Sequence, residues 1–385
     1  MKAKSIKGHN PAEIEAAMME SLAGGFEPTI AIVFLSIKQD RQAVCDILNK
    51  EHLDIIGATS SGEFIDGHQS EGDTVILLLD TNKSYYSILF EDIGERSVED
   101  ATSHLVHDAF HTFDRPAFIL ITTMLASDGR MLDGEEIVRY IETHAGPDIT
   151  MFGGMAGDDI TFAGTWVFTH GKSTDYGIAA LVLDESQIEL HGLAFSGWKP
   201  MGVVRTATKT EGNRIYTIDG RPALEMYSHY LGYNESSRDD QIAFFEKLGN
   251  HYPFQIEREN REPKMCNPIG YDKEKHALIC ESDVPQGSRM RFSTPPDFDI
   301  IETVIGKANE LRTELHAGAD ALLIFSCVGR KSALGPMAQQ ENERLQQLWN
   351  APMAGFYTYG EFGKGINGKH AFHSTTNSWV ALRER

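Results

Sequence analysis

Cysteine is scarce in this sequence, and the few that occur are isolated from one another. The four residues are Cys45, Cys266, Cys280 and Cys327. The chain therefore has no Cys-x-x-Cys pair, which excludes a zinc ribbon, a c-type haem attachment motif and a thioredoxin motif. We expect reduced thiols, as in a cytoplasmic protein.

Long hydrophobic runs and basic residues are scarce as well. The best apolar runs, 75–79 and 321–325, have the length of a strand and not that of a membrane helix. Residues 1–18 contain lysines without an apolar segment behind them, so we expect no signal peptide. With 35 Lys and Arg against 56 Asp and Glu, the formal net charge is −21, which argues against nucleic acid or a membrane as a partner.

The sequence also lacks familiar catalytic motifs, including Gly-x-Ser-x-Gly and His-Glu-x-x-His. Hydrophobic residues make up 41% of the 385 residues, enough for well-packed cores in two to three domains. Apolar patterning predicts strands at 29–37, 74–79, 85–90, 117–124 and 321–325. It predicts helices at 40–50, 97–112, 133–146, 223–230, 299–315 and 336–349.

An internal repeat is the most informative pattern. A strand leads through a helix to IIGATSSGEF, and similar units lead to MFGGMAGDD and to MAGFYTYGEF, each followed by another strand. Matching positions hold Gly62-Glu63, Gly157-Asp158 and Gly360-Glu361. Such strand ends often carry ligand sites, while the alternative is a turn glycine followed by a solvated acid.

The repeat predicts an α+β fold of mixed sheets flanked by helices, with an internally repeated strand–helix–strand–strand unit. A polar segment at 208–213, followed by Gly220-Arg221-Pro222, predicts a boundary between two domains. We therefore expect an extension at 1–27 and domains at 28–221 and 222–385. Residues 232–264 are polar and broken by Gly and Pro, which predicts irregular structure outside the core.

The last third of the chain contains the best candidate ligand site. The helix at 336–349 places Glu341 on its apolar face, where a carboxylate needs a partner. Arg330 lies shortly after the preceding strand, and the segment 355–361 adds Phe356, Tyr357, Tyr359, Gly360 and Glu361. These residues could bind a carboxylate, an ammonium group and an apolar body, or Arg330 and Glu341 could form an ion pair that joins the helix to the sheet.

Two further residue types have alternative interpretations. Cys327 could be a ligand or a nucleophile, although a small buried hydrophobic role is more common. His104, His107 and His111 include an i,i+4 pair of the kind that binds metals, but a solvated helix face is the favoured interpretation. His370 and His373 lie three apart in a predicted strand, so their side chains point to opposite sides, and one of them could ligate a haem iron.

Spaced motifs along residues 28–382 resemble the FIST family. IIGATSSGEF, MFGGMAGDD and YGIAALVLD are similar to the FIST N domain, and ALLIFSCVGRKSALG, MAGFYTYGEFG and FHSTTNSWVAL are similar to the FIST C domain. The family tends to have His-Asn near the end of the chain, where this sequence has His373-Ser374. The resemblance implies an intracellular sensory module for a small ligand such as an amino acid.

Three functions follow from the residues and the resemblance together. The first is a non-catalytic sensor that binds its ligand through the candidate site together with Cys327 and His373. It would regulate a separate histidine kinase, as in two-component signalling, or a diguanylate cyclase or phosphodiesterase. The second, implied by one branch of the family, is a haem-bound nitric oxide sensor. The third is an enzyme with Cys327 as its nucleophile.

Overall fold

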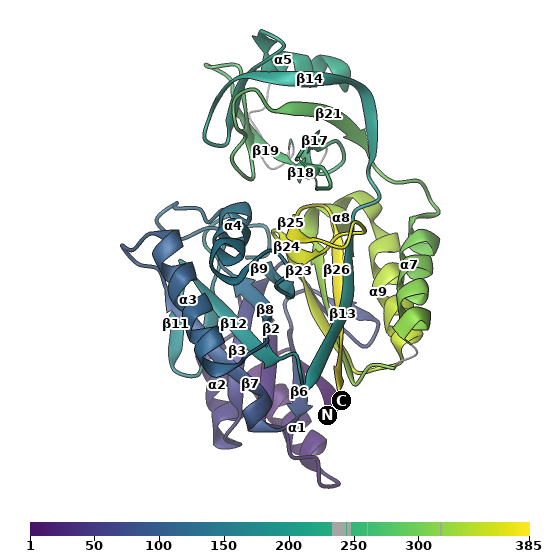
Figure 1. Ribbon diagram of the computed structural model, residues 1–385. Helices are drawn as coiled ribbons and strands as arrows, with labels where there is room; N and C mark the ends of the chain where they lie inside the picture. The colour runs from purple at the N-terminus through teal and green to yellow at the C-terminus, as the bar shows by residue number, and fades with distance from the viewer. Residues whose placement is uncertain (233–243, 245–247, 260, 316–317) are drawn as a thin grey trace.

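The computed structural model describes residues 1–232, 244, 248–259, 261–315 and 318–385. Its main body consists of three mixed sheets built from three copies of one unit (Figure 1). Each copy runs strand, helix, strand, helix, strand, hairpin, strand, with two successive helices at the second helical position of the third copy, and its second and third strands pair in parallel. The prediction of an α+β fold with an internally repeated unit is therefore confirmed.

The first two copies follow each other directly along the chain. The first comprises β1 (Lys2–Gly8), α1 (Pro11–Leu22), β2 (Ile30–Ser36), α2 (Arg41–Lys50), β3 (Asp54–Ser60), the hairpin β4 (Glu63–Ile65) and β5 (His68–Ser70), and β6 (Thr74–Asp80). After the short helix η1 (Lys83–Tyr85), the second comprises β7 (Tyr86–Asp92), α3 (Val98–Thr112), β8 (Pro116–Thr122), α4 (Gly134–Ala145), β9 (Met151–Met155), β10 (Val167–Thr169), β11 (Lys172–Thr174) and β12 (Gly177–Asp184).

The third copy is interrupted after its first strand. It comprises β13 (Ile188–Phe195), α7 (Ile300–Leu315), β22 (Ala321–Cys327), α8 (Val328–Leu334), α9 (Pro336–Trp349), β23 (Met353–Thr358), β24 (Glu361–Lys364), β25 (His370–His373) and β26 (Asn377–Glu384). The interruption between β13 and α7 forms a separate antiparallel unit, here called the inserted unit (199–294). Figure 1 shows it above the three-sheet body.

The inserted unit has its own core. Its described elements are β14 (Lys199–Glu211), β15 (Arg214–Ile218), β16 (Arg221–Pro222), α5 (Ala223–Tyr230), β17 (Phe254–Ile256), β18 (Lys264–Cys266), β19 (Pro268–Asp272), β20 (Ala277–Cys280) and β21 (Arg289–Thr294). The expectation of irregular structure at 232–264 is wrong for β17, because Phe254 and Ile256 are buried in this core. For 233–243, 245–247 and 260 it lies outside the described residues.

Each sheet is completed by a hairpin from another copy. The hairpin β4–β5 pairs with β23 of the third copy, β24–β25 pairs with β9 of the second, and β10–β11 pairs with β3 of the first. The three exchanges close a ring, so no copy completes its sheet alone. Phe34, Ile119, Phe325 and Phe356 belong to one hydrophobic core that all three sheets share.

A glycine and a phenylalanine meet at each of the three exchanges. Gly57 lies opposite Phe168, Gly355 opposite Phe64, and Gly153 opposite Phe362. A Cβ atom at Gly355 would collide with the Phe64 ring and with the carbonyl oxygen of Ile324. At Gly57 and Gly355 the absence of a side chain provides space for an aromatic ring from another copy, whereas a Cβ at Gly153 would collide with the backbone of Leu120 in the adjacent strand.

The repeated acids lie at the turns that follow these strands, and all three are buried. Glu63 accepts hydrogen bonds from Ser60 Oγ and from the backbone N–H of Asp73. Asp158 accepts hydrogen bonds from the backbone N–H groups of Ala163 and Gly164 at 2.7 and 3.1 Å. Because all three acids are buried, the alternative of a solvated acid is wrong, and a ligand site at these strand ends stays a prediction.

Replacing Gly355 by Ala should destabilise the protein by about 1–3 kcal/mol, the usual cost of overpacking a filled core. The physical reason is the collision with backbone as well as with a ring, which a side-chain rotation does not relieve. Urea unfolding followed by circular dichroism measures the effect. Gly306→Ala in α7 is the matched control, since a Cβ there meets nothing within 4 Å. The control should be neutral or stabilising, and equal effects of the two substitutions would contradict the prediction.

Candidate ligand-binding pocket

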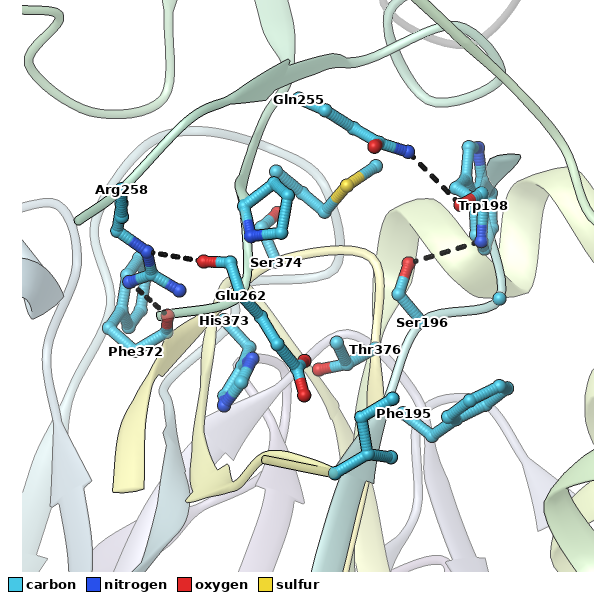
Figure 2. Close-up of a pocket in the computed structure, with 14 residues that line it drawn as sticks. Phe195, Ser196, Trp198, Gln255, Arg258, Glu262, Phe372, His373, Ser374 and Thr376 are labelled. Carbon is cyan, nitrogen blue, oxygen red and sulfur yellow. Dashed lines mark hydrogen bonds between the residues drawn. The ribbon is translucent and has the colours of Figure 1, made fainter. Parts of the chain in front are cut away.

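A cavity of about 280 Å³ lies between the inserted unit and the third copy (Figure 2). Three segments far apart in the sequence line it. The end of β13 and the residues after it contribute Phe195, Ser196, Gly197 and Trp198. The inserted unit contributes Gln255, Arg258, Glu262, Pro263 and Met265, and the β24–β25 hairpin and following turn contribute Ile366, Phe372, His373, Ser374 and Thr376.

The segment that carries Trp198 is held by two hydrogen bonds to the inserted unit. The indole N–H of Trp198 donates to the carbonyl oxygen of His251 at 3.0 Å, and Gln255 Nε2 donates to the carbonyl oxygen of Trp198 at 3.0 Å. Both bonds join the segment after β13 to the inserted unit. Phe195 and Phe372 add apolar surface from the three-sheet body.

Arg258 is the cationic group of the pocket and also connects the inserted unit to α4. Its Nε donates to the carbonyl oxygen of Glu262 at 2.8 Å, and its Nη1 lies 2.9 Å from Glu135 Oε2. Among the described residues, Nη2 has no hydrogen-bond partner, so it can donate to a ligand. A second ion pair, Arg261 Nη2 to Glu142 Oε2 at 2.5 Å, joins the same two parts of the molecule.

His373 is a neutral acceptor in the wall of the pocket. Its Nε2 lies 3.2 Å from the carbonyl oxygen of Gly363, which can only accept, so the proton is on Nε2. Burial, with a further contribution from the charge of Arg258, lowers the pKa of His373 to about 3. The imidazole is therefore uncharged at neutral pH, and Nδ1 keeps its lone pair.

Arg330 and Glu341, predicted as ligand-binding residues, bind each other in the structure. Arg330 lies in α8, and both side chains are fully buried. The guanidinium donates from Nε to Glu341 Oε2 at 2.9 Å and from Nη2 to Oε1 at 2.6 Å. The ion pair considered as the alternative is thus present, with both carboxylate oxygens engaged.

The same ion pair supports the wall of the pocket from behind. Arg330 Nη1 donates to the carbonyl oxygens of Ser196 and Thr375, which belong to two different lining segments. Asn377 Nδ2 donates to Glu341 Oε2 at 2.7 Å. Arg330 therefore fixes the distance between the segment after β13 and the turn before β26.

Glu361 supports the same turn from another side. It accepts hydrogen bonds from Thr358 Oγ1 at 2.6 Å, from Thr376 Oγ1 at 2.7 Å and from the Thr376 backbone N–H at 3.2 Å. Burial raises the pKa of Glu361 to about 8, although these hydrogen bonds lower it. The carboxyl group therefore holds its proton at neutral pH.

The other predicted residues are also buried and have partners in the protein. The hydroxyl of Tyr357 donates to Gln69 Oε1 at 2.7 Å, and that of Tyr359 donates to Asp158 Oδ1. Phe356 stacks on Phe34 in the shared core, and Gly360 packs against the Phe372 ring. Desolvation raises the pKa of the Cys327 thiol, so the reactive thiolate is disfavoured.

Of the nine residues predicted from the sequence, His373 alone is among the described residues that line this pocket. Ligand binding through the other eight stays a prediction, and three of them instead position the lining. The missed residues are Arg258, Glu262, Trp198, Phe195 and Phe372. One signal was available for two of them, because Phe195 and Trp198 flank the point where the third copy of the repeat is interrupted.

Replacing Arg330 by Met should destabilise the protein by about 3–5 kcal/mol, because Glu341 would remain buried without its cationic partner. Arg330→Met combined with Glu341→Leu should recover most of this loss. Arg344→Met, in the same helix as Glu341, is the matched control, since the Arg344–Glu302 pair is largely exposed and should contribute about 1 kcal/mol or less. Urea midpoints measure all three, and a double variant as unstable as the single one would contradict the interpretation.

Stability should fall as the pH rises from 6.5 to 8. Burial raises the pKa of Glu361 and Glu63 to about 8 and that of Glu281 to about 7. In this pH window the three carboxyl groups still hold protons in the folded state but have lost them in the unfolded state. Each unit by which the folded pKa exceeds the unfolded pKa corresponds to about 1.4 kcal/mol of unfolding free energy lost at high pH. Buried His370 and His373 have lowered pKa values and oppose this trend only below about 6.5.

Thermal melting across this pH window tests the effect. Glu361→Gln should make the fall less steep, because the amide cannot ionise. Glu27→Gln, at an exposed position, is the control and should leave the slope unchanged. A slope in Glu361→Gln equal to that of the wild type would show that Glu361 does not titrate as described.

Comparison with known proteins agrees with the motifs in the sequence. The sequence model of the FIST N domain matches residues 29–221, and that of the FIST C domain matches residues 223–364. The chain is also 22% identical to an uncharacterized protein of Methanocaldococcus jannaschii, over 91% of this chain and 70% of that protein. Among the described residues, no helix combines the length and apolar character that a membrane span requires. Because the two matched regions together cover most of its length, the chain belongs to the FIST family of sensory and signalling domains.

Proposed function

We propose that this protein is a non-catalytic sensor that binds a small ligand such as an amino acid in the pocket between the inserted unit and the third copy. Binding would change how the inserted unit contacts α4 and would thereby regulate a separate signalling protein. A histidine kinase or a diguanylate cyclase or phosphodiesterase is the proposed class of partner. Membership of a sensory family supports this assignment.

The composition of the pocket is the observation that carries the proposal. Arg258 Nη2 can donate to a carboxylate, Glu262 can accept from an ammonium group, and Phe195 and Trp198 offer apolar surface. His373 Nδ1 and Thr376 add polar groups at the base. A volume of about 280 Å³ suits a ligand of amino-acid size.

The placement of the pocket supports a signalling role. A ligand seated there would touch both the inserted unit and the three-sheet body, so its binding energy depends on how the two parts are docked. Arg258 is both a lining residue and the partner of Glu135 in α4. A carboxylate that binds Arg258 would compete with Glu135 for the guanidinium, which links occupancy to the contact with α4.

The lining does not fit a haem. A porphyrin is much larger than a cavity of about 280 Å³, and Arg258 and Glu262 place charged groups around it. We therefore do not propose a haem-based nitric oxide sensor from this site.

A catalytic role for Cys327 is also disfavoured by its surroundings. The side chain is 3% exposed, and the raised pKa keeps the thiol protonated. Among the described residues, Cys327 does not line the pocket. The proposal therefore stays with binding and not with catalysis.

Titration with the twenty common L-amino acids, followed by intrinsic fluorescence and by thermal shift, tests the proposal. At least one of them should change the fluorescence of Trp198 and raise the melting temperature. Ile366→Glu should weaken this binding at least about tenfold, because a charge at the apolar rim disfavours entry (1.4 kcal/mol corresponds to tenfold). Trp198→Phe should lose the fluorescence change.

Val203→Glu is the matched control for the rim variant. Val203 and Ile366 are exposed to a similar degree, 65% and 58%, but Val203 lies in β14 away from the lining residues. The control should bind like the wild type. If Ile366→Glu binds with unchanged affinity and Trp198→Phe keeps the fluorescence change, the ligand binds elsewhere. If none of the twenty amino acids binds the wild type, the proposed ligand class is excluded.

A further inference from the structure

A second cavity, of about 390 Å³, lies on the outer surface between α3 and α4. It is lined by Ser103, Val106, His107, Phe110, His111 and His144. Half of its lining residues are therefore histidines. They come from two helices that pack against each other, α3 for His107 and His111 and α4 for His144.

Two of the three histidines have the i,i+4 spacing of a metal-binding pair, and the third faces the same cavity. His107 and His111 stand one turn apart on the same face of α3, and their rings are nearly parallel with centroids 6.0 Å apart. All three side chains are exposed, and their ring nitrogens do not all lie within 4.8 Å of one another, so a shared metal requires rotations about χ1 and χ2 that turn one nitrogen of each ring into the cavity. Among the described residues, His111 and His144 have no hydrogen-bond or ion-pair partner that would oppose such rotations.

Asp108 supplies a second feature of metal sites. Its Oδ1 lies 3.4 Å from Nδ1 of His107, which leaves Nε2 of that ring for another partner. A carboxylate beside one ring nitrogen fixes the tautomer and makes the other nitrogen a better ligand. Its negative charge also favours a cation nearby.

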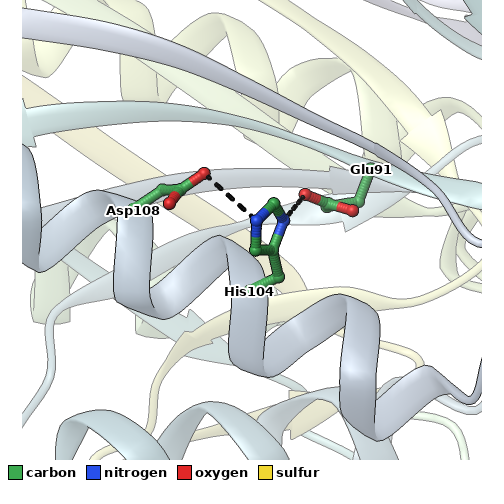
Figure 3. A group of neighbouring side chains, drawn as sticks. All are labelled: Glu91, His104 and Asp108. Atoms are coloured by element: carbon green, nitrogen blue, oxygen red, sulfur yellow. Dashed lines mark hydrogen bonds and ion pairs between the residues drawn. The ribbon is translucent and has the colours of Figure 1, made fainter.

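A neighbouring cluster, Glu91, His104 and Asp108, is less suited to a metal (Figure 3). Glu91 approaches His104 Nδ1 at 2.6 Å, and Asp108 faces the other ring nitrogen, Nε2, at 3.9 Å. The second oxygen of Glu91 lies 2.7 Å from Arg96 Nη2. The hydrogen bond that His104 donates to Glu91 raises the pKa of His104, so a proton competes more strongly with a metal for this ring.

From this geometry we infer that His107, His111 and His144 form a site for a first-row divalent transition metal such as Zn²⁺. Three imidazole ligands with a fourth position open to water or an exchangeable ligand are a common arrangement for this ion. Because a metal at this point would join α3 to α4, it would stabilise the helix whose Glu135 and Glu142 contact the inserted unit. The site does not depend on the ligand proposed for the pocket.

Isothermal titration of the untagged, chelator-treated protein with ZnCl₂ tests this inference. One Zn²⁺ should bind per chain and raise the melting temperature. Each of His144→Ala, His107→Ala and His111→Ala should weaken Zn²⁺ binding at least about tenfold. Removal of a group that only hydrogen-bonds a metal ligand already costs about that much, so removal of a ligand should cost no less.

His170→Ala and His104→Ala are the controls. His170 is exposed in the turn between β10 and β11 and lies outside the cavity, so its variant should bind like the wild type. Loss of binding in His104→Ala with retention in His144→Ala would move the metal to the Glu91 cluster and overturn the inference. A wild-type protein that does not bind Zn²⁺ would overturn it as well.

Discussion

The exchange of hairpins among the three copies is the constraint on which the rest of the structure depends. Each sheet takes its outer hairpin from another copy, so the three sheets close as a ring around one core. At two of the exchanges a glycine leaves room for a phenylalanine, Gly57 for Phe168 and Gly355 for Phe64. A Cβ atom at either position would collide with that ring and would disturb the contact between the two copies.

The pocket exists because the third copy differs from the other two. In the first and second copies a short turn joins the first strand to its helix, whereas β13 and α7 are separated by the whole inserted unit. The chain therefore leaves the body at Trp198 and folds back over the turn between β25 and β26. The ring of sheets lines one side of the space between these parts, and the inserted unit lines the other side.

Much of the fold could be predicted from local sequence. The apolar strand at 321–325, the helix at 336–349 and the three Gly-acid repeats correspond to elements of the structure, because periodicity and turn residues are local signals. The pairing of Arg330 with Glu341 was predictable as one of two alternatives, since a carboxylate on an apolar helix face needs a partner. The exchange of hairpins was not, because pairing between copies depends on tertiary contacts that no single segment encodes.

The site was harder to predict for a physical reason. Arg330 and Glu341 stand out in the sequence because a carboxylate on an apolar helix face needs a partner, yet groups whose hydrogen bonds are made within the protein have few left for a ligand. The groups that can bind one, such as Arg258 Nη2, lie in a polar segment with no distinctive pattern. Arg330 and Glu361 hold the segment after β13 and the turn before β26 in place, and the inserted unit supplies the charged lining groups. We therefore expect differences in ligand choice among FIST proteins to arise mainly in the inserted unit.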